Sequence, residues 1–127
     1  MVKHLPYRYR DYSRIAAEAS LAARDQGKFR EMHLLLLDRS PKLDRASLIG
    51  YAKDLKLDVP RFTRDLDAMR HVAEIDRDAK LAEALDLYNT PTIFINGVKL
   101  PGDRPIEAYR AVIDGELEAK GPPGKKR

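Results

Sequence analysis

A chain of 127 residues is long enough to bury one hydrophobic core and indicates a single domain. The absence of cysteine excludes disulfide, thiolate and zinc-thiolate chemistry, and the interleaving of 24 basic with 20 acidic residues favours a solvated mixed surface over a nucleic-acid-binding face. The longest strongly apolar run, Leu34 to Leu37, is far too short to cross a membrane, so no membrane partner is expected.

The first part of the chain predicts a short strand followed by a series of helices. Residues 2–5 can form the strand, which Pro6 would end because its ring removes a backbone donor. Apolar residues then recur at helical spacing, and Asp11, Asp44 and Asp58 are suitable N-caps. The predicted helices run from Asp11 to Gly27, from Lys28 to Asp38, from Asp44 to about Leu55, from Asp58 to about Met69 and from Val72 to about Leu87.

The next stretch predicts a β-hairpin with strands at residues 92–95 and 98–100. Between them stands Asn96-Gly97, the residue pair that best tolerates the positive φ angles of a two-residue type I′ turn. Residues 93–95 are all apolar, so we expect both faces of the first strand to be covered, as in a sheet flanked by helices. The second strand alternates and carries Lys99 on its other face, which is typical of a sheet edge.

The remaining residues predict one more helix and a tail. Pro105 suits the first position of a helix, and the apolar residues from Ile106 to Leu117 recur at helical spacing and form a stripe that should face inward. Residues 118–127 are rich in glycine, proline and lysine, so we expect a disordered basic tail.

The phrase Asn-Thr-Pro-Thr-Ile-Phe-Ile-Asn-Gly-Val at residues 89–98 resembles the cis-proline loop and hairpin of thioredoxin-fold proteins, and in detail those of the DsbA-like thiol-disulfide oxidoreductase family. Residues 26–33 and 44–59 resemble parts of that family's helical insertion, and residues 102–109 resemble its last helix. The resemblance extends from about Val2 to Leu117 and covers the later two-thirds of a DsbA-like domain.

This resemblance implies an α/β (α+β) fold. The expected domain is a truncated, thioredoxin-like DsbA-type fold over residues 1–117, with a helical insertion at about 11–87 and the hairpin and last helix at 88–117. It also implies that a central strand and the Cys-x-x-C pair of the family are missing here. The edge of strand 92–95 would then be open, and we expect either the N-terminal segment to fill it or two chains to pair across it as a homodimer.

By the same resemblance, Thr90, Pro91 and Thr92 are the predicted substrate-binding residues, with a cis peptide bond before Pro91. In the family, the backbone of this loop pairs with an incoming peptide strand opposite the reactive cysteine. The alternative is a turn that only starts the strand. No catalytic residue, cofactor or metal site is predicted, because the three histidines lie on different predicted elements without ligand spacing.

Two functions stay open. In the first, the chain is a redox-inert piece of a thiol-disulfide oxidoreductase whose cysteines lie upstream, because exchange requires a thiolate. In the second, it is a non-catalytic peptide-binding or dimerisation module that uses the Pro91 loop and the open sheet edge. The N-terminus has no apolar stretch of signal-peptide length, so the chain as it stands is expected in the cytoplasm; an upstream signal peptide and catalytic segment would favour the periplasm.

Overall fold

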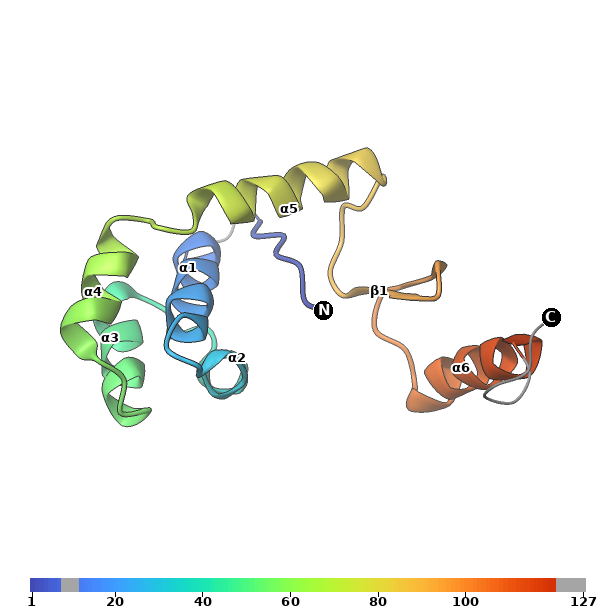
Figure 1. Cartoon of the computed structure of the whole chain (residues 1–127), viewed down its shortest axis with the longest axis horizontal. Helices are drawn as coiled ribbons and strands as arrows, with labels where there is room; N and C mark the ends of the chain where they lie inside the picture. The colour runs from blue at the N-terminus through green and yellow to red at the C-terminus, as the bar shows by residue number, and fades with distance from the viewer. Residues whose placement is uncertain (8–11, 121–127) are drawn as a thin grey trace. The chain divides into compact units, whose positions relative to one another are not determined.

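The computed structural model describes residues 1–7 and 12–120, so the predicted N-cap Asp11 and most of the predicted tail, residues 121–127, lie outside it (Figure 1). The chain divides into two compact units, an N-terminal unit up to Ala84 and a C-terminal unit from Leu85. The elements of the N-terminal unit are α1 (Ser13–Arg24), α2 (Phe29–Arg39), α3 (Arg45–Asp54), α4 (Val59–Asp67) and α5 (Val72–Ala84). Those of the C-terminal unit are β1 (Thr92–Ile95), β2 (Val98–Pro101) and α6 (Ile106–Lys120).

The hydrophobic core belongs to the N-terminal unit and is formed by α1 to α4 (Figure 1). Phe62, Leu48 and Met32 have no exposed surface, and each such side chain contributes about 1.5–3 kcal/mol by leaving water. On α1 the core positions are alanines, and a surface of small residues lets α2 and α4 pack closely against this helix. Helix α1 therefore contacts α2, α3, α4 and α5 and lies at the centre of the unit.

Local signals set several of the helix ends. The predicted caps are confirmed: the side chain of Asp44 accepts a hydrogen bond from the N–H of Ser47, and that of Asp58 accepts one from the N–H of Arg61. At the end of α1, Gly27 adopts a φ of 75° and allows the N–H of Lys28 to donate to the carbonyl of Ala23. Helix α5 ends at Ala84, earlier than the expected Leu87.

The predicted strand at residues 2–5 is wrong. The N–H of His4 donates to Oδ2 of Asp78 at 3.0 Å, and Nζ of Lys3 lies 3.5 Å from Oδ1 of the same residue. The segment thus satisfies its polar groups on a buried carboxylate of α5, and no strand occurs in residues 1–7. Among the described residues, the sheet receives no strand from this segment.

The C-terminal unit begins with the predicted hairpin. β1 and β2 pair antiparallel, with Ile95 opposite Val98 and Thr92 opposite Pro101, so β2 is one residue longer than expected. Asn96 and Gly97 have φ angles of 49° and 83°, as a type I′ turn requires. In the described residues the sheet consists of these two strands.

Within the described part of the C-terminal unit, the predicted covering of β1 on both faces does not occur. Ile93 is 39% exposed and Phe94 is 45% exposed. Helix α6 forms as expected and continues to Lys120, beyond the predicted boundary at Leu117, but none of its residues is buried. The apolar patterns of β1 and α6 are typical of enclosed elements, and the described residues of the C-terminal unit do not enclose them.

Candidate functional site

The Pro91 loop, residues 88–92, connects the chain to the first strand of the hairpin. The peptide bond between Thr90 and Pro91 is cis, as is the one between Ser40 and Pro41. The hydroxyl of Thr92 donates to the carbonyl of Asn89 at 2.8 Å, which closes the loop on itself. The N–H of Gly102 donates to the carbonyl of Pro91 at 2.8 Å, which attaches the loop to the far end of the hairpin. The loop is therefore held by one hydrogen bond within itself and by one to the residue that follows β2.

The three predicted site residues are consecutive and accessible. Thr90 and Pro91 are exposed, and Thr92 is half-buried. None of them titrates near neutral pH, and a threonine hydroxyl needs an adjacent base before it can attack a substrate. The loop can thus form hydrogen bonds through hydroxyl and backbone groups, and it presents the apolar ring of Pro91. Groups of these kinds can bind an extended peptide chain.

The register of the hairpin determines which backbone groups point away from β2. A two-residue turn makes Ile95 and Val98 a hydrogen-bonded pair, and such pairs alternate with non-bonded ones along an antiparallel ladder. The hydrogen bond from the N–H of Gly102 to the carbonyl of Pro91 fits this alternation, because Pro91 and Gly102 stand at a position where a bonded pair is expected. Thr92 and Phe94 therefore direct their N–H and C=O groups to the opposite edge of β1. We call this the open edge, because the described residues provide no strand beside it.

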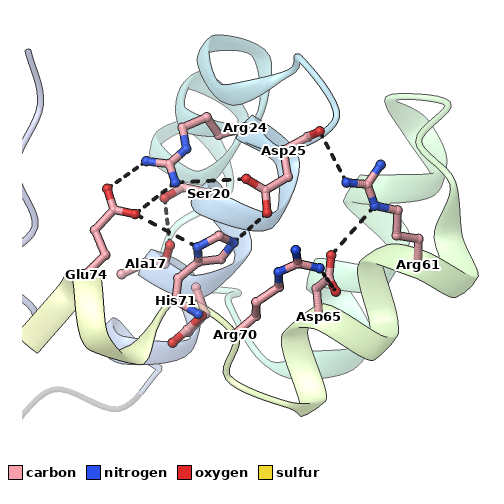
Figure 2. A network of polar contacts seen from close by, with 10 residues as sticks. Ala17, Ser20, Arg24, Asp25, Arg61, Asp65, Arg70, His71 and Glu74 are labelled. Carbon is pink, nitrogen blue, oxygen red and sulfur yellow. Dashed lines mark hydrogen bonds and ion pairs between the residues drawn. The ribbon is translucent and has the colours of Figure 1, made fainter.

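A second group of polar residues, not predicted from the sequence, lies between α1 and α5 (Figure 2). Nε2 of His71 lies 2.8 Å from Oδ2 of Asp25, and the guanidinium of Arg24 donates two hydrogen bonds to the carboxylate of Glu74, at 2.7 and 2.8 Å. The N–H of His71 donates to Oε2 of Glu18 at 3.0 Å. These contacts attach the first turn of α5 to α1 and the turn that follows it.

The carboxylates of this polar group differ in their surroundings. Burial raises the pKa of Glu18 above its usual value, with the hydrogen bond from His71 opposing the shift. The hydrogen bonds from Arg24 lower the pKa of Glu74. Sequence reasoning could have found Glu18, because it stands three residues after Ile15 and four before Ala22, on the inward stripe of α1. A carboxylate at such a position is an uncommon core residue.

The histidines do not converge on a metal. His4 and His33 both contact Phe29, with ring centroids 6.4 and 5.6 Å from it, whereas His71 lies in the polar group described above. No cluster of three His, Cys, Asp or Glu residues suited to a metal ion occurs in residues 1–7 and 12–120. Within the same residues, no helix has the length and apolar character needed to cross a bilayer.

Helices inserted before a hairpin that starts at a cis-proline define a thioredoxin-like protein of the DsbA type. Residues 3–114 match the family described as "DSBA-like thioredoxin domain", and the chain belongs to this family. The expected family and fold class are thus confirmed.

The fold has a solved counterpart. The crystal structure of a thioredoxin-like oxidoreductase from Silicibacter pomeroyi DSS-3 is 28% identical and superposes with a TM-score of 0.79, covering 90% of this chain and 65% of that one. About a third of the solved chain therefore has no counterpart here.

Curated relatives are much longer. The Na(+)/H(+) antiporter NhaA 1 of Salinispora arenicola is 42% identical over 112 residues, which are 87% of this chain and 17% of the antiporter. The Na(+)/H(+) antiporter NhaA of Herminiimonas arsenicoxydans is 39% identical over 114 residues, 90% of this chain and 18% of the antiporter. The chain thus spans less than a fifth of the length of these relatives.

Proposed function

We propose that this chain is the peptide-holding part of a DsbA-like thioredoxin domain and is redox-inert on its own. Family membership supports the first half of the proposal, and the absence of cysteine supports the second. Thiol-disulfide exchange begins with attack by a thiolate on a disulfide sulfur, and this chain has no sulfur able to form one. A Cys-x-x-C segment joined to the chain would supply the exchange, while Thr90, Pro91 and Thr92 hold the substrate.

The observation that carries the proposal is the position of the Pro91 loop beside the open edge. An extended peptide that lies antiparallel to β1 can pair with the N–H and C=O groups of Thr92 and Phe94. Such main-chain pairing provides affinity with little demand on the peptide's sequence. The expected substrate class is therefore an extended or unfolded segment of a protein.

Two measurements on the pure chain test the proposal. In an insulin-reduction assay with dithiothreitol, we expect no acceleration over the reductant alone, and any acceleration would contradict the redox-inert half. In a backbone-amide NMR titration with an extended peptide, we expect shifts at Thr90, Thr92 and Phe94.

The control for the titration is the same peptide with alternate amides N-methylated, so that it cannot donate to β1. We expect this peptide to leave the three amides unmoved. Equal binding of the two peptides, or shifts confined to α1–α4, would rule out binding at the open edge.

A second candidate function is homodimerisation through the open edge. The exposure of Ile93 and Phe94 favours it, because an apolar strand with an unpaired edge promotes association. In this version two copies of β1 pair antiparallel about a two-fold axis. Light scattering after size-exclusion chromatography tests it, and the mass of a single chain at every concentration would exclude it.

Ion transport is not carried over from the relatives. The stretch of 112 residues shared with the antiporter of Salinispora arenicola is as long as the match to the thioredoxin domain, residues 3–114. What this chain has in common with the antiporters is therefore the thioredoxin-like domain. We propose no transport activity for it.

A further inference from the structure

Asn96 and Gly97 form the turn of the hairpin and are the one Asn-Gly pair in the sequence. Both residues are exposed. An asparagine can react with its own main chain when the amide nitrogen of the next residue attacks the side-chain carbonyl carbon, and a following glycine has no side chain to hinder this attack. The turn therefore places a nucleophile next to an electrophile.

Neither reacting group is engaged elsewhere in the described structure. The ladder of the hairpin ends with the pair Ile95 and Val98, which leaves the N–H of Gly97 outside it. The side-chain amide of Asn96 forms no hydrogen bond with the described residues. A Cβ added to Gly97 would meet no atom within 4 Å, so the turn has room for a new ring.

The closed turn itself holds the two groups apart. Asn96 has a φ of 49°, and a left-handed residue has ψ near about 47°, which turns the following amide nitrogen away from the side chain. Ring closure therefore requires Asn96 to leave this conformation, and the turn must open.

Opening of the hairpin costs little. The hairpin consists of two strands of four residues each, and a lone two-stranded hairpin is marginally stable in water. Ile93, Phe94 and Val98 are between 38% and 45% exposed, so few apolar contacts are lost when the strands separate. The rate of the reaction should follow the fraction of molecules in which the hairpin is open.

From these observations we propose that Asn96 and Gly97 are a self-modification site, at which the opened turn deamidates to aspartate and isoaspartate. The amide nitrogen of Gly97 gives its proton to solvent and bonds to Cγ of Asn96, and the Cγ–Nδ2 bond breaks to release ammonia. Water then hydrolyses the five-membered imide. Cleavage between the nitrogen and Cγ gives aspartate, and cleavage between the nitrogen and the main-chain carbonyl carbon gives isoaspartate.

The isoaspartate product weakens the hairpin. Its main chain runs through Cβ and Cγ, which adds one backbone atom to the turn. Because a two-residue turn sets the pairing of Ile95 with Val98, the longer turn disrupts this register. The reaction thus makes the loss of strand pairing irreversible as the protein ages. This inference holds whatever binds at the open edge, so it is independent of the proposed function.

The experiment incubates the whole chain at mildly alkaline pH and follows both asparagines by mass spectrometry, after digestion at mildly acidic pH. We expect Asn96 to convert at least about tenfold faster than Asn89, a difference of about 1.4 kcal/mol in activation free energy, because the branched side chain of Thr90 hinders attack on Asn89. An isoaspartyl methyltransferase should label the aged chain. Equal rates at the two asparagines, or no isoaspartate after ageing, would overturn the proposal.

The matched control places the same residue pair in a helix. Asp114 and Gly115 lie inside α6, where the amide of Gly115 belongs to the helical hydrogen-bond ladder. In Asp114→Asn we expect position 114 to convert at least about tenfold more slowly than Asn96 in the same molecule. Equal rates at these two positions would show that the residue pair alone sets the reactivity, which contradicts the role of the opened turn.

A second variant tests the opening step. Leu100 pairs with Ile93 and is not adjacent to the reacting residues. Glycine weakens a strand, so Leu100→Gly should open the hairpin more often and deamidate about two- to fivefold faster than the native chain. The same rate in both proteins would contradict a reaction that proceeds through the opened hairpin.

Discussion

Glu18 and Glu74 show how two carboxylates a few ångströms from one histidine respond oppositely to their surroundings. Glu18 has left water almost completely, whereas Glu74 is partly exposed and bonded to Arg24. Burial favours the neutral form of the first, and a cationic partner favours the charged form of the second. Their effects on stability must therefore depend on pH with opposite signs.

For Glu18, the raised pKa means that the folded protein binds a proton more tightly than the unfolded chain. This contribution to the free energy of unfolding is fully present below the unfolded pKa and is lost as pH rises through the folded one. Because Glu18→Gln removes the titration, we expect the variant to gain stability relative to the native chain as pH rises from the unfolded pKa through the raised folded one. Urea unfolding followed by circular dichroism at stepped pH measures this difference, and a gain that shrinks with rising pH would contradict it.

Glu74→Gln should behave in the opposite way. The lowered pKa of Glu74 contributes stability that is present above the unfolded pKa and lost as pH falls through the folded one. The variant should therefore be less stable than the native chain near neutral pH, and the difference should vanish in acid. The same unfolding series checks this, and a difference that is independent of pH would show that lost packing is responsible.

At the scale of elements, the ends of helices depend on single backbone conformations. Helices α1, α3 and α4 all end with a residue of positive φ, namely Gly27, Lys56 and Met69. In each case the following N–H donates to a carbonyl five residues back, as from Lys28 to Ala23. Of these three residues only Gly27 is a glycine, the residue type that adopts a positive φ without strain.

The same substitution at two glycines should have opposite effects. Gly27→Ala places a side chain at a φ of 75°, and we expect a loss of about 1–2 kcal/mol in the free energy of unfolding. Gly50→Ala lies inside α3 with helical geometry and open space around it, and we expect a gain of about 0.5–1 kcal/mol. Because neither new methyl group meets an atom within 4 Å, chemical denaturation of the two variants isolates the backbone effect. A loss in both variants would show that the φ angle at Gly27 is not the cause.

The elements that the sequence predicts well are those specified locally. The caps Asp44 and Asp58 and the turn at Asn96 and Gly97 each need only their neighbours in the chain, and all occur as expected. The strand at residues 2–5 needs a distant partner, and it does not form. Thr90, Pro91 and Thr92 were recognisable only because a whole phrase resembles a family, whereas Glu18 required attention to which face of α1 it occupies.

At the scale of the whole molecule, the two units differ in what they enclose. The N-terminal unit buries Phe62, Leu48 and Met32 completely, while the hairpin and α6 leave Phe94, Ile106 and Leu117 between 45% and 61% exposed. The solved thioredoxin-like oxidoreductase is matched over 65% of its length, so a full-length relative has further chain with which to cover such surfaces. On its own, this chain should hide them by association.

We therefore expect the average mass of the isolated chain, measured by light scattering, to rise with concentration. Phe94→Asp places a charge at the open edge and should lower the mass toward that of one chain, because a charged edge strand resists pairing. Leu34→Asp is the matched control: Leu34 is 53% exposed on α2, so the variant makes the same change of charge in the unit that has its own core. An equal effect of the two variants would assign the association to general hydrophobicity. A fall confined to Phe94→Asp would locate it at β1, where the peptide titration probes the same backbone groups.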